Sequence, residues 1–252
     1  MLTNERHADI IEKLQMTGKV LVKDLCALYE VTEDCIRKDL RLLEKQGYCK
    51  RVYGGAILVK NEIRHNVYER IDKDVDKKSI IANKAYDEIQ DGETIFMDVS
   101  TTNLILAKLL AQGNKRVIVI SNMIDVLTIL ATNPNITVIG TGGNVNLELN
   151  GFVGSITMSI VSKHHFSKCF IGTTGIDYNM NMLTTFDMED GLVKDLVISN
   201  STTNYILMED AKFKAIGGYK YIDIKKVYYI ITNTEIDNKY KQYLKKHAVE
   251  VL

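Results

Sequence analysis

The spacing of hydrophobic residues divides the chain into a helical N-terminal part and a longer part in which strands and helices alternate. Up to about Ile57 apolar residues recur at helical spacing, and the last positions become rich in glycine. From Glu93 onward, short runs of β-branched residues alternate with stretches of helical period. Because each pattern requires its own core, this switch predicts two domains.

The C-terminal pattern predicts an α/β domain with a mainly parallel sheet, because a repeated β-α-β order joins neighbouring strands through helical crossovers. The expected strands are Glu93–Val99, Arg116–Ser121, Ile136–Ile139, Lys168–Ile171, Asn204–Met208 and Val227–Thr232. The expected helices are Asn103–Gln112, Ile124–Asn133, Val153–Lys163, Glu189–Ser199 and Lys239–Lys246.

The N-terminal pattern predicts an α+β winged helix-turn-helix. A first helix would end at Thr17-Gly18, and a short second helix would cover Val22–Tyr29. The side chains expected to face the core are Ile10, Ile11 and Leu14 in the first helix, and Leu25 and Leu28 in the second.

A third helix is expected from Glu33 to about Gln46, with Thr32 as its N-cap. At about 100° per residue, its apolar positions fall within about 60° of one another and its cations share a separate arc of about 100°. One side of this helix therefore packs and the other side is basic. The packing residues are Ile36, Leu40 and Leu43, and the basic residues are Arg37, Lys38, Arg41 and Lys45.

Local charge favours DNA binding by this helix and by the segment after it. Between Cys35 and Arg51 six basic residues stand against two acids, in a chain whose formal charge is zero. The next segment, Tyr48 to Ile57, is typical of a short β-wing. A lone basic helix is more often an ordinary solvated face, but three helices with a basic wing favour insertion into the major groove. The expected DNA-binding residues are Thr32, Glu33, Asp34, Arg37, Lys38, Arg41, Lys45, Lys50, Arg51, Tyr53, Gly54 and Gly55.

Composition excludes several other classes of protein. With 252 residues, 46% of them hydrophobic, the chain can bury the cores of two domains. Its four cysteines form no C-x-x-C pair and lie near no set of histidines, so reduced thiols and no metal site are expected. The first residues carry charges, and no apolar run approaches the ~18 residues that a membrane span needs. We therefore expect a cytoplasmic protein with no cofactor and no membrane partner.

Polar residues at the ends of the expected strands predict a binding site for an anionic small molecule. Ser100, Thr101 and Thr102 open a helix directly after a strand, where free N–H groups and hydroxyls suit a phosphate. In open parallel sheets, ligands bind at the carboxyl ends of the strands. Each such turn alone is more often structural, but they recur along one sheet edge. The other turns are Ser121-Asn122, Gly142-Gly143 and Gly172-Thr173-Thr174-Gly175.

The segment V-T-E-D-C-I-R-K-D-L-R-L-L-E-K-Q-G-Y-C-K-R-V-Y-G-G-A (Val31–Ala56) resembles regulators of the DeoR family. In that family V-S-x-x-T-I-R-R-D-L is followed by L-E-x-x-G and R-x-x-G-G-A. Thr32, Cys35 and Lys38 replace the usual Ser, Thr and second Arg, and Lys38 cannot make the bidentate guanine contact of an arginine. The resemblance implies double-stranded operator DNA as partner, read by a homodimer or higher homo-oligomer.

The C-terminal part is similar to the effector domain of the same family, through D-V-S-T-T (Asp98–Thr102), F-I-G-T-T-G-I-D (Phe170–Asp177) and D-A-K-F (Asp210–Phe213). This implies a fold like ribose-5-phosphate isomerase, within the sugar-isomerase/CoA-transferase-like folds, and a phosphorylated sugar or related metabolite as effector. By that resemblance Ser100, which stands where the family usually has Gly, would hold the phosphate with Thr101 and Thr102. The residues expected to contact the effector are Asp98, Ser100, Thr101, Thr102, Asn122, Gly142, Gly143, Gly172, Lys194, Asp210 and Lys212.

Two alternatives remain beside a ligand-controlled repressor of a sugar-metabolism operon. A sugar-phosphate isomerase on the same fold would need a general base, and Asp98, Glu189 or Asp210 has the right side chain, but nothing fixes an acid/base pair. A C-terminal domain that serves only for oligomerisation is the other. For Lys194 and Lys212, a surface salt bridge is an equal alternative to ligand contact.

The expected domains are a winged helix-turn-helix over residues 1–57, a helical linker over 58–77 and an effector-sensing domain over 78–252. The stretch Val59–Lys78 is crowded with charged residues and poor in Gly and Pro, which favours a solvated helix. Since no other covalent path joins the domains, this linker would carry the coupling between effector and DNA.

Overall fold

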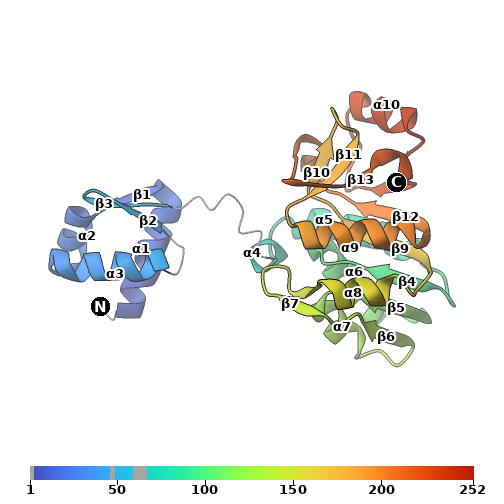
Figure 1. Cartoon of the computed structure of the whole chain (residues 1–252), viewed down its shortest axis with the longest axis horizontal. Helices are drawn as coiled ribbons and strands as arrows, with labels where there is room; N and C mark the ends of the chain where they lie inside the picture. Colours follow the sequence, from blue (N-terminus) through green and yellow to red (C-terminus); the bar gives the residue numbers. More distant parts are fainter. Residues whose placement is uncertain (1–2, 46–48, 59–66) are drawn as a thin grey trace. The chain divides into compact units, whose positions relative to one another are not determined.

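The structure of the chain is a computed structural model that describes residues 3–45, 49–58 and 67–252. The chain separates into two compact units, Met1–Arg64 and His65–Leu252, and each is described by itself (Figure 1).

The N-terminal unit is a winged helix-turn-helix, as the sequence predicts. Three helices pack against an antiparallel sheet of three described strands in the order β1-β3-β2. The elements are α1 (Thr3–Thr17), β1 (Lys19–Leu21), α2 (Val22–Tyr29), α3 (Glu33–Lys45), β2 (Cys49–Val52) and β3 (Gly55–Leu58).

The core of this unit confirms most of the predicted inward positions. Ile10 and Leu14 of α1 and the three packing residues of α3 are buried. The prediction for Leu28 is wrong, because its side chain is 54% exposed. The inward stripe of α2 follows i, i+3, i+4 and i+7 from Val22, and that stripe leaves Leu28 beside the core rather than in it.

The second unit is built on a seven-stranded sheet in which every described pair of neighbouring strands is parallel, which confirms the predicted α/β class. The order is β15-β14-β12-β9-β4-β5-β6. The strands are β4 (Thr94–Met97), β5 (Val117–Ser121), β6 (Ile136–Gly140), β9 (Phe166–Gly172), β12 (Ser201–Leu207), β14 (Tyr229–Ile231) and β15 (Glu250–Val251).

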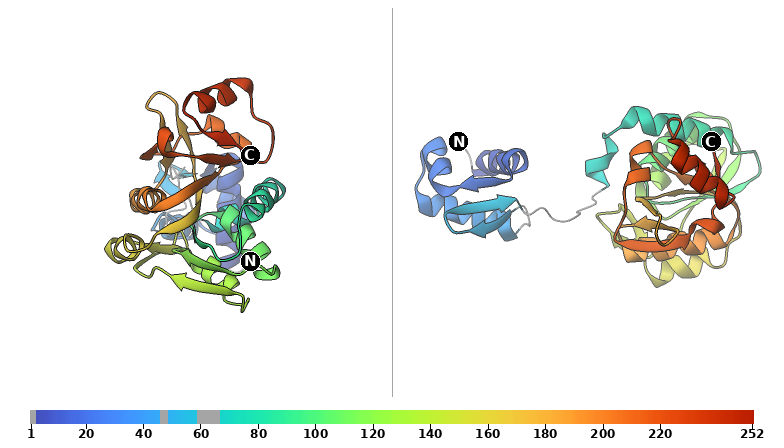
Figure 2. Two further views of the ribbon diagram at one scale, coloured as in Figure 1. Left: turned by 90° about the vertical axis from the view of Figure 1, so that its right-hand side faces the viewer. Right: turned by 90° about the horizontal axis from the view of Figure 1, so that it is seen from above.

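Helices cover both faces of this sheet, and Figure 2 shows the layers from two further directions. In β4, Ile95 and Met97 point into one apolar cluster with α5, α6 and α7, whereas Phe96 points into the other with α8, α9 and α10. A strand buried on both faces reads as a continuous apolar run, which explains the β-branched stretches of the sequence. The helices are α5 (Val75–Asp87), α6 (Thr101–Gln112), α7 (Ile124–Leu130), α8 (Ser155–Val161), α9 (Met188–Ser199) and α10 (Asn238–Lys246).

Two small antiparallel sheets accompany the main one. β7 (Asn144–Asn146) pairs with β8 (Gly151–Val153), so the helix expected from Val153 begins only at Ser155. β10 (Gly175–Asp177), β11 (Met182–Thr185) and β13 (Tyr219–Asp223) form the second small sheet. Two short 3-10 helices, η1 (Asp210–Lys214) and η2 (Ile224–Lys226), follow β12 and β13.

Part of the expected linker belongs to the second unit. Residues 59–66 lie outside the described residues, but α4 (Tyr68–Ile71) and the start of α5 fall within His65–Leu252. Val67 and Lys78 are buried, so the expectation of a solvated stretch does not hold at these two positions, whereas the residues between them are exposed or half-buried.

Candidate functional site

Helix α3 is fixed to α1 by a buried ion pair as well as by its apolar side. Arg6 donates to the carboxylate of Asp39 from Nε at 2.7 Å and from Nη2 at 3.3 Å, and His7 Nε2 lies 2.9 Å from the same carboxylate. Burial alone would raise the pKa of Asp39, but the hydrogen bonds from Arg6 and His7 lower it. At the start of α3, Thr32 Oγ1 accepts a hydrogen bond from the N–H of Cys35 at 3.4 Å, which confirms the predicted N-cap.

The opposite side of α3 presents its cations to solvent. Arg37, Lys38 and Arg41 are exposed. Arg37 pairs with Glu33 at 2.6 Å and with Asp34 at 3.8 Å, yet its side chain remains 60% exposed. Within the described part of the chain no ion pair engages Lys38 or Arg41, so both are available to phosphates or base edges.

The wing is a hairpin of β2 and β3, and it too carries cations. Lys50 and Tyr53 are exposed. Arg51 is held by Glu44 of α3, with 2.6 Å from Nε to Oε2 and 2.9 Å from its backbone N to Oε1. The side chain of Lys45 lies outside the described residues. The contact between Arg51 and Glu44 joins the wing to the C-terminal end of α3.

The glycine pair of the wing serves two structural purposes. Gly54 has φ of +78°, in the left-handed region that glycine adopts without strain. Gly55 lies so close to β1 that a Cβ would come 2.1 Å from the carbonyl oxygen of Val20. Gly54 makes the turn, and Gly55 permits the pairing of β3 with β1.

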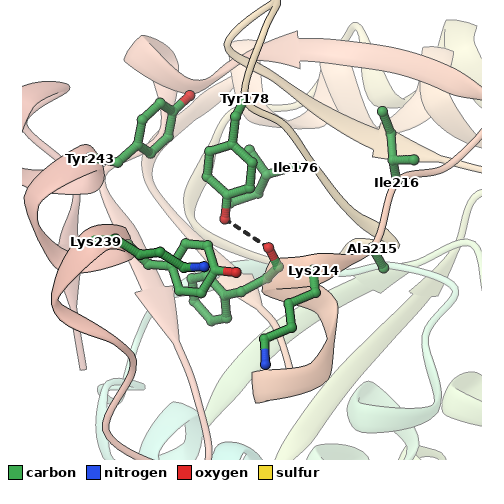
Figure 3. Close-up of a pocket in the computed structure, with 9 residues that line it drawn as sticks. Ile176, Tyr178, Lys214, Ala215, Ile216, Lys239 and Tyr243 are labelled. Atoms are coloured by element: carbon green, nitrogen blue, oxygen red, sulfur yellow. Dashed lines mark hydrogen bonds between the residues drawn. The ribbon is translucent and has the colours of Figure 1, made fainter.

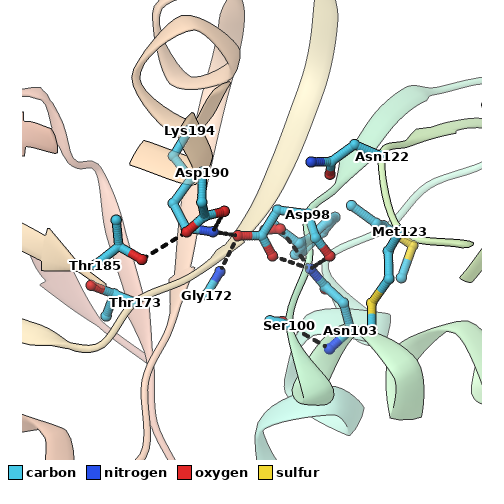
Figure 4. Close-up of polar contacts among 12 residues, drawn as sticks. Asp98, Ser100, Asn103, Asn122, Met123, Gly172, Thr173, Thr185, Asp190 and Lys194 are labelled. Atoms are coloured by element: carbon cyan, nitrogen blue, oxygen red, sulfur yellow. Dashed lines mark hydrogen bonds and ion pairs between the residues drawn. The ribbon is translucent and has the colours of Figure 1, made fainter. Parts of the chain in front are cut away.

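In the second unit, Asp98 at the end of β4 is the centre of a buried polar network (Figure 4). Lys194 of α9 donates to Asp98 Oδ2 and lies 2.8 Å from Asp190 Oδ1. The N–H of Gly172 donates to the same Oδ2 at 2.9 Å, and Asn103 Nδ2 donates to Oδ1 at 2.7 Å. Burial disfavours a charged Lys194, but Asp190 and Asp98 outweigh it and raise its pKa. Lys194 is therefore a buried cation, not a surface salt bridge.

The residues predicted to bind an anion lie at the start of α6. Ser100 is the N-cap, and its Oγ accepts a hydrogen bond from the N–H of Asn103 at 3.1 Å. Thr101 and Thr102 follow in the first turn, and all three hydroxyl residues are less than 9% exposed. Asn103 also donates to the carbonyl oxygen of Phe170, so the first turn of α6 is locked between the ends of β4 and β9.

The next strand ends bring unsatisfied polar atoms to the same edge. Asn122, after β5, donates from Nδ2 to the carbonyl oxygen of Phe152 at 3.1 Å, but its Oδ1 is buried without a hydrogen-bond partner. Thr141, after β6, has a buried Oγ1 that also lacks a partner. Because buried polar atoms are nearly always hydrogen-bonded, these two are candidates to meet a ligand.

The predicted glycines allow close approach of backbones at this edge. Gly142 has φ of +61°, and its carbonyl accepts a hydrogen bond from Thr157 Oγ1 at 2.7 Å. A Cβ at Gly143 would lie 2.3 Å from the same Thr157 oxygen. A Cβ at Gly172 would lie 2.5 Å from the Cβ of Ser100. Gly172 therefore permits contact between the end of β9 and the start of α6.

Asp210 and Lys212 lie after β12, in η1, and both have protein partners. Asp210 Oδ1 accepts hydrogen bonds from Lys77 at 2.8 Å and from Asn233 at 3.2 Å, and its N–H donates to Asn233 at 2.9 Å. Lys212 Nζ lies 3.6 Å from Glu209 Oε1. Among the described residues, none of these hydrogen bonds or ion pairs joins Asp210 or Lys212 to the Asp98 network.

Several residues of the edge were missed by sequence reasoning. Asn103 and Asp190 bind the network around Asp98, and Thr185 Oγ1 donates to Asp190 Oδ2 at 2.7 Å. The spacing of Asp190 and Lys194, four residues apart on one helix, is a pattern that could have indicated their pairing. No sequence pattern indicated Arg70, whose guanidinium interacts with Asp98 and Asp190.

A separate hollow of about 570 Å³ lies outside the strand ends (Figure 3). Four of its nine lining residues are aromatic, and two are the lysines Lys214 and Lys239. Tyr178 donates to the carbonyl oxygen of Phe213 at 2.9 Å, and Tyr240 and Tyr243 pack against Tyr178. None of the residues predicted to bind effector lines it.

Among the described residues no group of three His, Cys, Asp or Glu side chains is placed to hold a metal ion. None of the helices in the described ranges is long and apolar enough to cross a bilayer. All four cysteines are free.

Comparison with known families decides what these two units are. Residues 6–62 match the DeoR-like helix-turn-helix domain, and residues 73–234 match the DeoR C terminal sensor domain. The chain belongs to the DeoR family. The resemblance seen in the sequence is thereby confirmed, and a DeoR-family chain with these two domains is a DNA-binding transcription regulator.

Named relatives of this DeoR-family chain span almost its full length. It is 31% identical to the HTH-type transcriptional regulator GolR of Listeria innocua, over 96% of each chain. It is 28% identical to the HTH-type transcriptional repressor GlcR of Bacillus subtilis, over 100% of this chain and 96% of the relative. It is also 28% identical to the glycerol-3-phosphate regulon repressor of Escherichia coli, over 84% of each. Ribose 5-phosphate isomerase A of Methanocaldococcus jannaschii superposes with a TM-score of 0.39 and 16% identity, over 55% of this chain and 54% of the isomerase.

Proposed function

We propose that this regulator represses a sugar-metabolism operon and that a phosphorylated sugar or related metabolite controls it. The observation that carries the proposal is the pairing, in one chain, of an exposed cationic α3 with a sheet edge that offers an anion-binding helix start. The names of two relatives, a repressor and a glycerol-3-phosphate regulon repressor, support the direction of control.

On DNA, α3 would lie in the major groove with its apolar side on α1. Lys38 and Arg41 would reach phosphates or bases first, because they need not leave an ion pair. Arg37 would exchange Glu33 for a phosphate, and Lys50 and Arg51 of the wing would add backbone contacts. Operators are read as paired half-sites, so the active form would be at least a homodimer.

In the sensor, the start of α6 would hold the phosphate through the N–H groups and hydroxyls of Ser100, Thr101 and Thr102. The buried acceptor of Asn122 would take a sugar hydroxyl. Asp98 and Lys194 would offer the effector polar groups of fixed orientation, because their mutual contact holds both side chains in one rotamer. Residues 58–77 would connect this site to the DNA-binding domain.

An isomerase remains the weaker proposal. A general base must be free to accept a substrate proton, but both carboxylate oxygens of Asp98 already accept hydrogen bonds from protein donors. Asp210 is likewise engaged by Lys77 and Asn233. We therefore place the chain among cytoplasmic regulators that carry no catalytic residue and need no cofactor.

The test is an electrophoretic shift on the DNA upstream of the chain's own gene, with and without sugar phosphates. We expect a specific complex at moderate salt, and its loss on addition of one class of phosphorylated metabolite. The variant Arg41→Ala should weaken the complex, whereas Arg116→Ala, an exposed cation of the sensor unit, should not. A chain that forms no specific complex with any candidate operator would refute the proposal.

A further inference from the structure

The hollow beside α10 is lined by aromatic rings whose polar ends already have partners (Figure 3). The ring of Tyr178 packs edge-on against Tyr243, with 4.8 Å between centroids, and stacks with Tyr240 at 5.6 Å. The hydroxyl of Tyr178 donates to the carbonyl oxygen of Phe213 at 2.9 Å, and the hydroxyl of Tyr243 donates to Asn181 Oδ1 at 3.0 Å. Hydrogen bonds and packing together therefore hold these rings as a preformed aromatic surface.

The apolar part of the lining belongs to the core of the sensor. Ile176 and Phe213 are buried in the same cluster as Tyr240. The N–H of Ile176 donates to the carbonyl oxygen of Ala215 at 3.2 Å, so β10 is joined to the segment that follows η1. Because these elements are fixed in the protein itself, the hollow exists before a ligand arrives, and a preformed site loses less conformational entropy on binding.

The two lysines that line the hollow have charges that no carboxylate neutralises within the described part of the chain. Lys214 and Lys239 are exposed, and no ion pair among the described residues engages either of them. Lys239 Nζ lies 4.7 Å from the centroid of the Tyr240 ring. By contrast Lys241, on the same helix, pairs with Glu235 at 2.8 Å. Aromatic surface with two unpaired cations complements a ligand that combines a ring with a negative charge.

The same lysines disfavour a second protein as the occupant of the hollow. Lysine is depleted in protein–protein interfaces, and charged residues are depleted at their centres. A space of about 570 Å³ also suits a small molecule.

We propose that this hollow is a second ligand site of the sensor unit and that it takes a planar aromatic anion, a ring that bears a carboxylate or another anionic group. The ring would lie among Tyr178, Tyr240 and Tyr243, and the anionic group would pair with Lys214 and Lys239. This site is separate from the strand ends, and the assignment does not depend on the identity of the effector that binds there.

The experiment titrates the full chain by calorimetry with three matched probes. The first is 2-naphthoate, which has both the ring and the charge; 2-naphthamide lacks the charge, and decahydro-2-naphthoate lacks the aromatic ring. We expect 2-naphthoate to bind with a Kd of about 1 mM or lower. The amide should bind about three- to tenfold more weakly, because it cannot pair with the lysines. The saturated acid should bind at least about threefold more weakly, because it cannot stack.

The decisive variant is the double substitution Lys214→Met with Lys239→Met. It should lower the affinity for 2-naphthoate to that of 2-naphthamide and should leave the affinity for the amide within about twofold of wild type. Both lysines are exposed, so the unfolding temperature of the sensor should not change. Lys246→Met is the matched control, because Lys246 is an exposed lysine of α10 that does not line the hollow. It should keep the preference for 2-naphthoate.

Methyl-labelled isoleucine gives the position of the probe by nuclear magnetic resonance. The methyl signals of Ile176 and Ile216, which both line the hollow, should shift when 2-naphthoate is added to the wild-type chain. The signal of Ile118, a partly exposed residue of β5 that does not line the hollow, should stay in place.

Several results would overturn this assignment, and none of them involves DNA, so the proposed function is tested separately. If 2-naphthoate does not bind at about 1 mM, or if either matched probe binds equally well, the ligand class is wrong. If 2-naphthoate binds but the signals of Ile176 and Ile216 do not move, it lies elsewhere. If sedimentation shows an oligomer that 2-naphthoate dissociates, the hollow is an interface between copies of the chain and not a ligand site.

Discussion

Replacing Asp39 with alanine should unfold the N-terminal unit while the sensor unit stays folded. The substitution leaves the guanidinium of Arg6 buried without its partner, and both side chains of the pair are only 8% exposed. Removing one partner of a buried ion pair costs about 3–5 kcal/mol. A unit of 64 residues is stable by about 3–10 kcal/mol in total, so the cost approaches the whole stability of Met1–Arg64.

Calorimetry of the full chain would measure the loss, because two units that unfold separately give two transitions. In Asp39→Ala the transition of the N-terminal unit should disappear or move far down in temperature, the sensor transition should stay in place, and operator binding should be lost. Asp34→Ala is the matched control, since that carboxylate is 85% exposed and its removal should cost less than about 0.5 kcal/mol. The double variant Arg6→Met with Asp39→Leu should recover stability, because it leaves neither charge buried. An Asp39→Ala chain within about 1 kcal/mol of wild type would refute the reasoning.

The same ion pair predicts a pH dependence. In the folded unit the pKa of Asp39 lies below its ordinary value of 3.8. Its contribution to stability is therefore complete above that ordinary value and is lost as the pH falls through the lower folded pKa. At neutral pH this ion pair should make a constant contribution to the unfolding temperature of the N-terminal unit in the wild-type chain. Below about pH 4 that contribution should decrease, and the unfolding temperature should fall with it. The variant Asp39→Asn should lack this part of the pH dependence. If the unfolding temperature falls with acid in the same way in both chains, the prediction is contradicted.

Two further predictions concern the two binding surfaces. Arg41→Ala should cost ~1–3 kcal/mol of operator binding if the side chain reads a base, whereas Lys38→Ala should lower the slope of log affinity against log salt by about 0.9 if it meets a phosphate. If the affinity for operator and its salt dependence are unchanged in both variants, α3 is not part of the DNA interface. Gly172→Ala should destabilise the sensor by about 1–3 kcal/mol, because the added Cβ would lie 2.5 Å from the Cβ of Ser100. Calorimetry should show no such loss for the control Gly218→Ala, whose added Cβ would have no atom within 4 Å.

The sequence predicted those features that depend on local periodicity. Helix α3 has its apolar and basic residues on separate arcs, so its position and its buried side follow from spacing alone. Strands such as β4 and β5 are largely apolar runs, and the alternation of strands with helices implies parallel pairing. Thr32 could be placed as a cap because that role depends only on the residues that follow it.

Features that depend on distant partners could not be read in this way. Asp39 counts as one of two acids in a basic stretch until Arg6, 33 residues earlier, is seen beside it. Arg70 belongs to a charged stretch that reads as solvated, and only the fold brings it to Asp98. The small sheet of β10, β11 and β13 consists of strands of three to five residues that are too short for a period to show. The sequence therefore predicted the position of the candidate site from the residues at its strand ends, but it did not indicate all of the cations near that site.

The aromatic hollow beside α10 has a practical consequence for chemical screening. Its volume of about 570 Å³ falls within the range of drug-sized pockets, and its four aromatic residues suit flat aromatic fragments. Compounds that settle among Tyr178, Tyr240 and Tyr243 would raise the melting temperature of the sensor without occupying the strand ends. Hits from a thermal screen should therefore be sorted by competition with inorganic phosphate before any of them is taken for an inducer analogue.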